Sequence, residues 1–294
     1  CCRTMFIEQA IFTSCRTDRV DGYQLAATSD GVTRQQADEL TAWGPAHDSL
    51  LDPSSRAGSV NFHRLAEGTY CISKTVPAGA EYSGRQGPRV FTTFLLVDDE
   101  MMERFAFQPF RILDAVIAAG HARVLRRIPE SLPRIQLRGR ASASLAMLLE
   151  PLADPSCRAK IQNLVSAAAQ GPTLVRSSDN LRVWFDWLLH AVPLECRSEL
   201  VFSTGMKHSP QRTFRLMAAP ADPMEAGHVT RQLGGNLVDL DNEDAQPDAD
   251  GAWSQTIEEL FSHGRTDELL AQLHQPRPGL TLASLQSPGT FASI

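Results

Sequence analysis

The thiol of Cys71 and the imidazole of His63 are side chains whose types and spacing could support nucleophilic chemistry. A thiol-dependent hydrolase needs a thiolate, a base that takes the thiol proton and a third group that orients the base. Cys71 lies within a strand-like pattern, and not at a helix N-terminus or sharp turn that would lower the pKa of its thiol. A packed strand cysteine beside a loop or edge histidine is therefore the better interpretation. Catalysis by Cys71 and His63 is kept as an alternative.

The segment at residues 82–89, with the sequence YSGRQGPR, could bind an anion or a partner protein. Glycine N–H groups and the planar guanidinium groups of Arg85 and Arg89 suit phosphate or carboxylate. The segment does not match the phosphate-loop pattern GxxxxGK[ST], so it is not a nucleotide-hydrolysis motif. We predict a contact surface that includes Tyr82, Ser83, Arg85 and Arg89. A solvated hairpin loop, or a site for a phosphorylated or nucleotide ligand held by the two arginines, remains open.

A second polar turn, GMKHSP at residues 205–210, lies between two strand-like segments. Its glycine, lysine and histidine resemble a phosphate cradle. Because the turn joins two strands, and no helix N-terminus follows it, a hairpin tip is the simpler interpretation. We predict that Lys207 and Arg212 extend the contact surface.

The composition of the 294-residue chain excludes several classes of protein. Its net charge of −6 argues against nucleic-acid binding, which usually needs a basic surface. No apolar run reaches the roughly 18 to 20 residues that cross a bilayer. The six cysteines include no CxxC and no paired Cys/His spacing typical of zinc sites. We expect a cytoplasmic protein with free thiols, without a metal or cofactor, and, since no catalytic motif is present, without enzymatic activity.

The first half of the chain combines strand and helix patterns. Strands are predicted at residues 6–13, 22–28, 68–75 and 90–97, and helices at residues 33–43, about 99–107 and 109–119. Thr33 and Gln36 have the spacing of a capping box at the start of the first helix. The strand at 90–97 is almost continuously apolar, as in a strand buried on both faces.

The second half predicts helices first and strands afterwards. Helices are expected at residues 141–152, 156–170 and 178–191, strands at 198–204, 213–219 and 236–240, and short helices at 254–262 and 266–273. The acidic segment DNEDAQPDAD at 241–250 reads as a solvated linker, and the segment after Pro276 as disordered.

Together these patterns predict an α+β protein with a mostly antiparallel sheet and flanking helices, then a helical segment that returns to strands. Residues 121–140 contain six arginines and read as an irregular basic connector. The predicted domains are an N-terminal α+β domain at 1–120, the connector at 121–140, a helical and strand domain at 141–241, and a linker with short helices and a tail at 242–294.

Several short blocks in order resemble the bacterial family called GTPase-associated protein 1. The N-terminal blocks are QAIFTS at 9–14, GYQ at 22–24, FH at 62–63, GTYCISKT at 68–75, EYSGR at 81–85 and RVFTT at 89–93. Blocks similar to the middle region of the family are LVFSTG at 200–205, FRL at 214–216 and VDL at 238–240. The resemblance covers about residues 7–241.

The resemblance implies a component of a bacterial conflict or antiviral defence system. Proteins of this kind accompany a GTPase and act as adaptors or scaffolds that link nucleotide sensing to an effector. The family offers no catalytic residues to place on this sequence. The expected partners are therefore proteins, a GTPase and an effector encoded nearby, and the expected role is protein–protein interaction.

Overall fold

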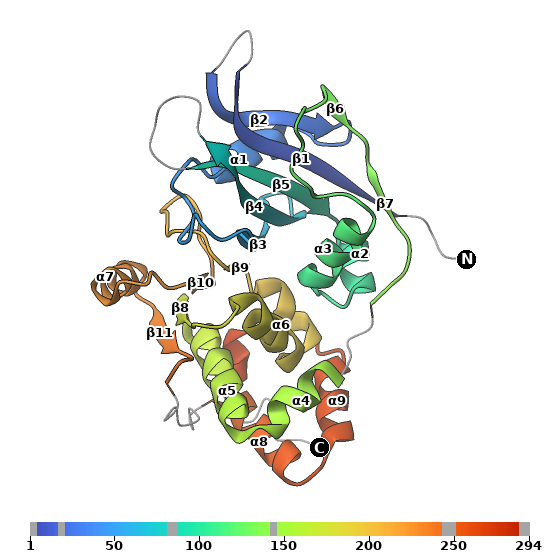
Figure 1. Ribbon diagram of the computed structural model, residues 1–294. Helices are drawn as coiled ribbons and strands as arrows, with labels where there is room; N and C mark the ends of the chain where they lie inside the picture. Colours follow the sequence, from blue (N-terminus) through green and yellow to red (C-terminus); the bar gives the residue numbers. More distant parts are fainter. Residues whose placement is uncertain (1–4, 17–20, 81–87, 142–145, 243–250, 288–294) are drawn as a thin grey trace. The chain divides into compact units, whose positions relative to one another are not determined.

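The computed structural model describes residues 5–16, 21–80, 88–141, 146–242 and 251–287 (Figure 1). The chain divides into two compact units. The N-terminal unit comprises residues 1–105, 109–141 and 202–213, and the C-terminal unit comprises residues 106–108, 142–201 and 214–294. No helix in the described ranges is long and apolar enough to cross a membrane.

The N-terminal unit is built on a mostly antiparallel sheet. Its strands are β1 (Met5–Arg16), β2 (Asp21–Ser29), β3 (Ser59–Arg64), β4 (Tyr70–Ala80), β5 (Pro88–Val97), β6 (Ser131–Leu132), β7 (Ile135–Leu137) and β9 (Phe202–Ser203). They lie in the order β9-β3-β4-β5-β1-β2-β6, and β7 pairs with β1. The short β2–β6 pair is parallel and the other pairs are antiparallel.

Alternation along β1 and β5 sends apolar side chains to both faces of this sheet. On one face, Phe12, Cys71 and Phe94 pack with Leu40 of α1 (Arg34–Trp43). On the other face, a second core forms around Ile11, Phe91, Ala27 and Leu132, with Leu125 and Ile128 packed against it. Helices α2 (Asp99–Arg104) and α3 (Pro109–Ala118) follow β5 in the chain (Figure 1). The central strands are therefore buried on both faces, as the apolar pattern predicted.

The predicted capping box is present at the start of α1. The backbone N–H of Gln36 donates to Thr33 Oγ1 at 3.1 Å, and the N–H of Thr33 donates to Gln36 Oε1 at 3.0 Å. Two of the helix's first N–H groups thereby gain acceptors that the helix itself cannot supply.

Residues 121–140 differ from the irregular connector that the arginines suggested. They lie in the N-terminal unit and supply β6 and β7 to its sheet. Leu132, Ile135 and Leu137 are buried, while Arg134 and Arg138 are exposed. Alternating apolar residues attach this segment to the sheet. The arginines between them made this alternation hard to recognise in the sequence.

The C-terminal unit combines helices with three short parallel strands. Its helices are α4 (Ala146–Ala153), α5 (Pro155–Gln170), α6 (Leu181–Ala191), η1 (Leu194–Glu199), α7 (Pro223–Leu233), α8 (Ala252–Ser262), α9 (Thr266–His274) and η2 (Ala283–Gln286). The strands β8 (Thr173–Arg176), β10 (Leu216–Ala218) and β11 (Asn236–Asp239) form a parallel group with β8 in the centre. The α+β class predicted from the sequence is confirmed by both units.

The C-terminal unit departs from the predicted elements at several places. Strand β8 and helix α7 were not predicted, and η1 occupies the start of the strand expected at 198–204. The segment after Pro276, expected to be disordered, is ordered through residue 287, with Leu282 and Leu285 fully buried. The side chain of Gln286 also donates to the carbonyl of Ser166 at 3.0 Å. The two buried leucines and this hydrogen bond hold the segment in place. Most of the predicted acidic linker, residues 243–250, lies outside the described residues.

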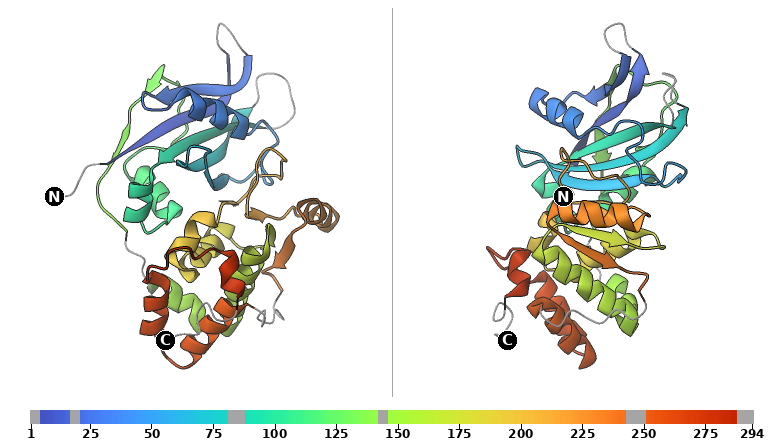
Figure 2. Two further views of the ribbon diagram at one scale, coloured as in Figure 1. Left: turned by 180° about the vertical axis from the view of Figure 1, so that it is seen from behind. Right: turned by 90° about the vertical axis from the view of Figure 1, so that its left-hand side faces the viewer.

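Figure 2 gives two further views of these elements. In each of them α1 lies against the β1–β5 part of the N-terminal sheet, and α5 lies beside the strands of the C-terminal unit.

Candidate functional site

His63 and Cys71 lie directly opposite each other in the β3–β4 ladder, so their side chains share one face of the sheet. Burial, with a contribution from the Glu39 carboxylate, raises the pKa of the Cys71 thiol well above its ordinary value. Burial lowers the pKa of His63 to about 3, and the imidazole stacks on the ring of Trp43 at 3.7 Å between centroids. Both groups are neutral near pH 7, whereas catalysis requires the thiolate. The hydrolase alternative stays a prediction that this geometry does not support.

Of the predicted loop residues, Tyr82, Ser83 and Arg85 lie outside the described residues. Arg89 lies in β5, where its guanidinium group donates to the carbonyl of Ala78 at 3.1 Å and 3.3 Å. These hydrogen bonds link β5 to β4.

The turn predicted at residues 205–212 is held against the N-terminal sheet; we call it the Arg212 segment. A β-bridge joins Met206 to Leu50, and the N–H of Lys207 donates to the carbonyl of Ser49 at 2.8 Å. Met206 and Leu50 pack with Val90 in a small buried cluster. Val90 brings β5 next to the Arg212 segment, but the preceding Arg89 points to the opposite face of the strand. Val90 thus contacts the Arg212 segment through this apolar cluster, whereas Arg89 points away from it.

Lys207 forms an ion pair with Asp48 across 2.7 Å. Asp48 has a φ of 59°, a left-handed conformation that aspartate tolerates better than most residues. Both side chains are well exposed, so the pair contributes less than about 1 kcal/mol to stability. The pairing leaves the charge of Lys207 largely compensated.

Arg212 is a buried residue with an exposed fraction of 9%. The Nε atom of its guanidinium group is fully buried and, among the described residues, has no hydrogen-bond partner. Its backbone N–H donates to the carbonyl of Ser209 at 3.0 Å, which closes the turn. Burial lowers the pKa of Arg212. A buried guanidinium without an anion is costly, so this site favours a carboxylate or phosphate.

His208 lies close enough to Arg212 to feel its charge. Burial and the Arg212 charge both lower the pKa of His208, which keeps its imidazole neutral near pH 7. Its Nδ1 atom is buried and, in the described part of the chain, makes no hydrogen bond. Arg212 therefore supplies one positive charge and His208 a neutral ring. This arrangement suits a ligand group with a single negative charge. His208 belongs to the turn GMKHSP that the sequence analysis singled out. The sequence did not predict that its imidazole would be partly buried.

A metal centre finds no support in the described ranges, where no group of three or more His, Cys, Asp or Glu residues is arranged to hold an ion. The free cysteines described are Cys15, Cys71, Cys157 and Cys196, and two of these, Cys71 and Cys196, are buried.

The N-terminal part of the chain is similar to a known protein family. Residues 6–135 match a family described as GTPase-associated protein 1, N-terminal domain type 2. No curated protein matches the chain. The matched segment begins in β1 and ends in β7, so it spans the sheet from β1 to β6 but not the Arg212 segment. The predicted resemblance to the GTPase-associated protein 1 family is thus confirmed over residues 6–135, which match its N-terminal domain of type 2.

Proposed function

We propose that this chain is a non-enzymatic adaptor in a GTPase-linked bacterial conflict or antiviral defence system, and that it holds a protein partner at the Arg212 segment. The family match supports an association with a GTPase. The observation that carries the proposal is that Arg212 is a buried residue whose Nε atom lacks an acceptor among the described residues.

The chemistry of Arg212 favours a carboxylate on a partner protein. Arginine binds a carboxylate through two parallel hydrogen bonds, and such contacts often dominate binding energy when they are shielded from water. The neighbouring Pro210, Gln211 and Thr213 are exposed, so a partner can reach the turn. An Asp or Glu side chain of the partner would complete the hydrogen bonding of Arg212 and leave neutral His208 inside the interface.

The loop at 82–89 belongs to the same proposal. Tyr82, Ser83 and Arg85 are its proposed contact residues, whereas Arg89 supports the hairpin through the carbonyl of Ala78. The proposed partners are a GTPase and an effector encoded beside this chain.

Co-purification of the full chain with the products of neighbouring genes, with and without GTP, tests this function. We expect a nucleotide-dependent complex with a GTPase. Arg212→Gln should weaken it by about tenfold or more because the charged contact is lost. Arg212→Lys keeps the charge but not the planar geometry, and should restore the complex only in part.

Lys207→Gln is the matched control because this neighbouring cation already pairs with Asp48. It should change the affinity by no more than about threefold. Equal losses for Lys207→Gln and Arg212→Gln would indicate a diffuse charge effect. A folded Arg212→Gln variant that binds as tightly as the parent would remove Arg212 from the interface, and no partner under either condition would overturn the adaptor role.

A further inference from the structure

The N-terminal unit contains a cavity of about 270 Å³ between its sheet and residues 120–133. The cavity is lined by residues of β1, β5 and β6 and by the turn that follows α3. It lies apart from the Arg212 segment, and nothing in the adaptor proposal uses it. Its volume is just below the roughly 300 to 1,000 Å³ typical of small-molecule sites, which suits a small ligand.

The floor of the cavity is apolar with one hydroxyl. Ile11 and Thr93 are paired across β1 and β5 and therefore point to the same face of the sheet. Ile11 is 3% exposed and Leu132 is 6% exposed, so the body of a ligand would rest on buried aliphatic side chains.

Thr93 is the polar group that points to a ligand. The residue is 4% exposed, and its side chain lines the cavity. A hydroxyl group can both donate and accept a hydrogen bond, so Thr93 can bond to a polar atom of a molecule in the cavity.

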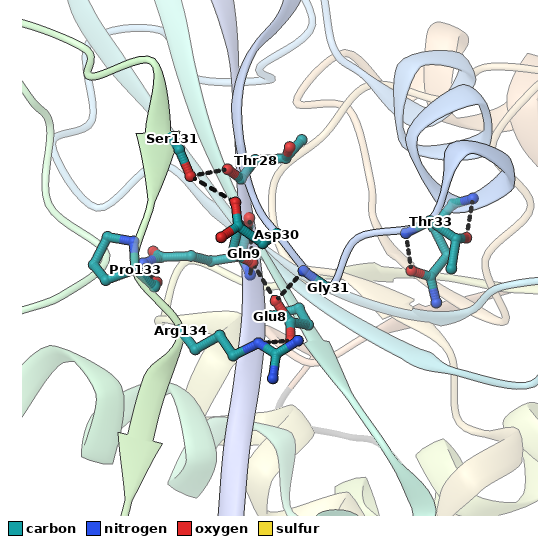
Figure 3. Close-up of polar contacts among 11 residues, drawn as sticks. Glu8, Gln9, Thr28, Asp30, Gly31, Thr33, Ser131, Pro133 and Arg134 are labelled. Carbon is teal, nitrogen blue, oxygen red and sulfur yellow. Dashed lines mark hydrogen bonds and ion pairs between the residues drawn. The ribbon is translucent and has the colours of Figure 1, made fainter.

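One wall of the cavity is fixed by polar contacts that Figure 3 shows. The side-chain amide of Gln9 donates to the carbonyl of Pro133 at 2.7 Å, and Arg134 forms an ion pair with Glu8 across 2.6 Å. Ser131 also donates to Asp30 at 3.0 Å. These contacts hold the β6–β7 segment against β1 and β2, so the cavity has a defined shape.

The rim of the cavity is basic. His121 and Arg123 line it on either side of Ala122, whose φ of 53° is in the left-handed region that alanine rarely adopts. The turn begins at Gly120, with a φ of 86°. In the described ranges no acidic side chain pairs with Arg123. The sharp turn therefore places two side chains that can donate hydrogen bonds to an anion, His121 and Arg123, beside the apolar floor of the cavity.

We propose that this cavity binds a small organic anion, either a phosphate ester or a carboxylate, that carries an apolar body. Arg123 and His121 bind the anionic group at the rim, Thr93 donates to or accepts from a polar atom, and Ile11 and Leu132 cover the apolar body. The rim of the cavity is charged and the residues below it are aliphatic. The cavity therefore favours an anion with an apolar body over a free inorganic anion, which would bury no apolar surface.

Titration of the full chain with four simple probes tests the proposal. Phenyl phosphate and benzoate combine a ring with an anion, benzyl alcohol lacks the charge, and inorganic phosphate lacks the ring. Binding is followed by NMR shifts of the methyl groups of Ile11 and Leu132. We expect saturable shifts with one or both aromatic anions, and at least about tenfold weaker binding of benzyl alcohol and inorganic phosphate. A preference between phenyl phosphate and benzoate identifies the anionic group.

Two variants and a matched control complete the test. Arg123→Gln should weaken the aromatic anions about tenfold and leave benzyl alcohol unchanged, and Thr93→Val, which keeps the shape, should weaken the anions by about three- to tenfold. Arg127→Gln removes an arginine of the same segment that does not line the cavity, and should have little effect. If Thr93→Val unfolds, Thr93→Ser should bind like the parent. Absence of saturable methyl shifts with every probe, or equal losses for Arg123→Gln and Arg127→Gln, would overturn the proposal.

Discussion

The carboxylate of Glu8 in β1 forms an ion pair with Arg134, between β6 and β7, across 2.6 Å (Figure 3). The same carboxylate accepts hydrogen bonds from the hydroxyl of Ser29 at 2.5 Å and from the N–H of Gly31 at 3.1 Å. A single acidic side chain therefore ties together three segments of the N-terminal unit that are distant in sequence.

Removal of Glu8 should cost more stability than removal of Arg134. Glu8→Ala leaves Ser29 and Gly31 without their acceptor and should lower the free energy of unfolding by about 1 to 3 kcal/mol. Arg134→Ala should lower it by less than about 1 kcal/mol, because the arginine side chain is 52% exposed. Urea unfolding of both variants measures the difference. A larger loss for Arg134→Ala would contradict this ranking.

Gly31 should not tolerate a larger side chain. A Cβ atom at this position would overlap the carboxylate of Glu8 and approach the guanidinium of Arg134. Gly31→Ala should therefore displace the network and cost about 1 to 3 kcal/mol. Gly171→Ala is a suitable control, since Gly171 has an extended backbone and open space around its Cβ position. Comparable unfolding midpoints for the two variants would show that Glu8 moves aside without cost.

His63 should make the protein less stable as the pH falls. Its pKa is about 3 in the folded chain and about 6.5 when exposed, so the unfolded chain binds the proton first. Stability is then lost progressively between about pH 6.5 and 3, by about 1.4 kcal/mol per pH unit from this group.

The measurement is the free energy of unfolding at pH 6.5 and pH 5 for the parent and for His63→Phe. The parent should lose about 2 kcal/mol more than the variant over this interval, because phenylalanine cannot take up a proton. Parallel pH profiles for the two proteins would mean that His63 already binds a proton in the folded state.

Cys71 should be inert to alkylation in the native protein. Its thiol is fully buried with a raised pKa, as is that of Cys196, whose pKa is about 12. Iodoacetamide followed by mass spectrometry should label the half-buried Cys15 and Cys157 first, and Cys71 only after unfolding. Native labelling of Cys71 as fast as that of Cys15 would favour the hydrolase alternative. So would a folded Cys71→Ala variant that has lost a measured activity.

The sequence by itself determined the local features of this protein. The capping box of Thr33 and Gln36 defined the start of α1, because both of its hydrogen bonds form within four residues. The apolar run at 90–97 predicted a strand buried on both faces, since side-chain burial along a strand follows residue type directly. The α+β class follows from such segments taken together.

Tertiary structure decided the features that depend on distant parts of the chain. Burial of Arg212 requires its turn to fold back on Leu50 and Val90, which lie more than a hundred residues earlier. The cavity exists only because residues 120–133 return to the face of β1 and β5, a pairing that arginines among Leu132 and Ile135 concealed. A residue's type limits the bonds that it can form, but whether its polar atoms are buried is decided by remote segments. The Nε atom of Arg212 lacks a partner only because such segments exclude water from it.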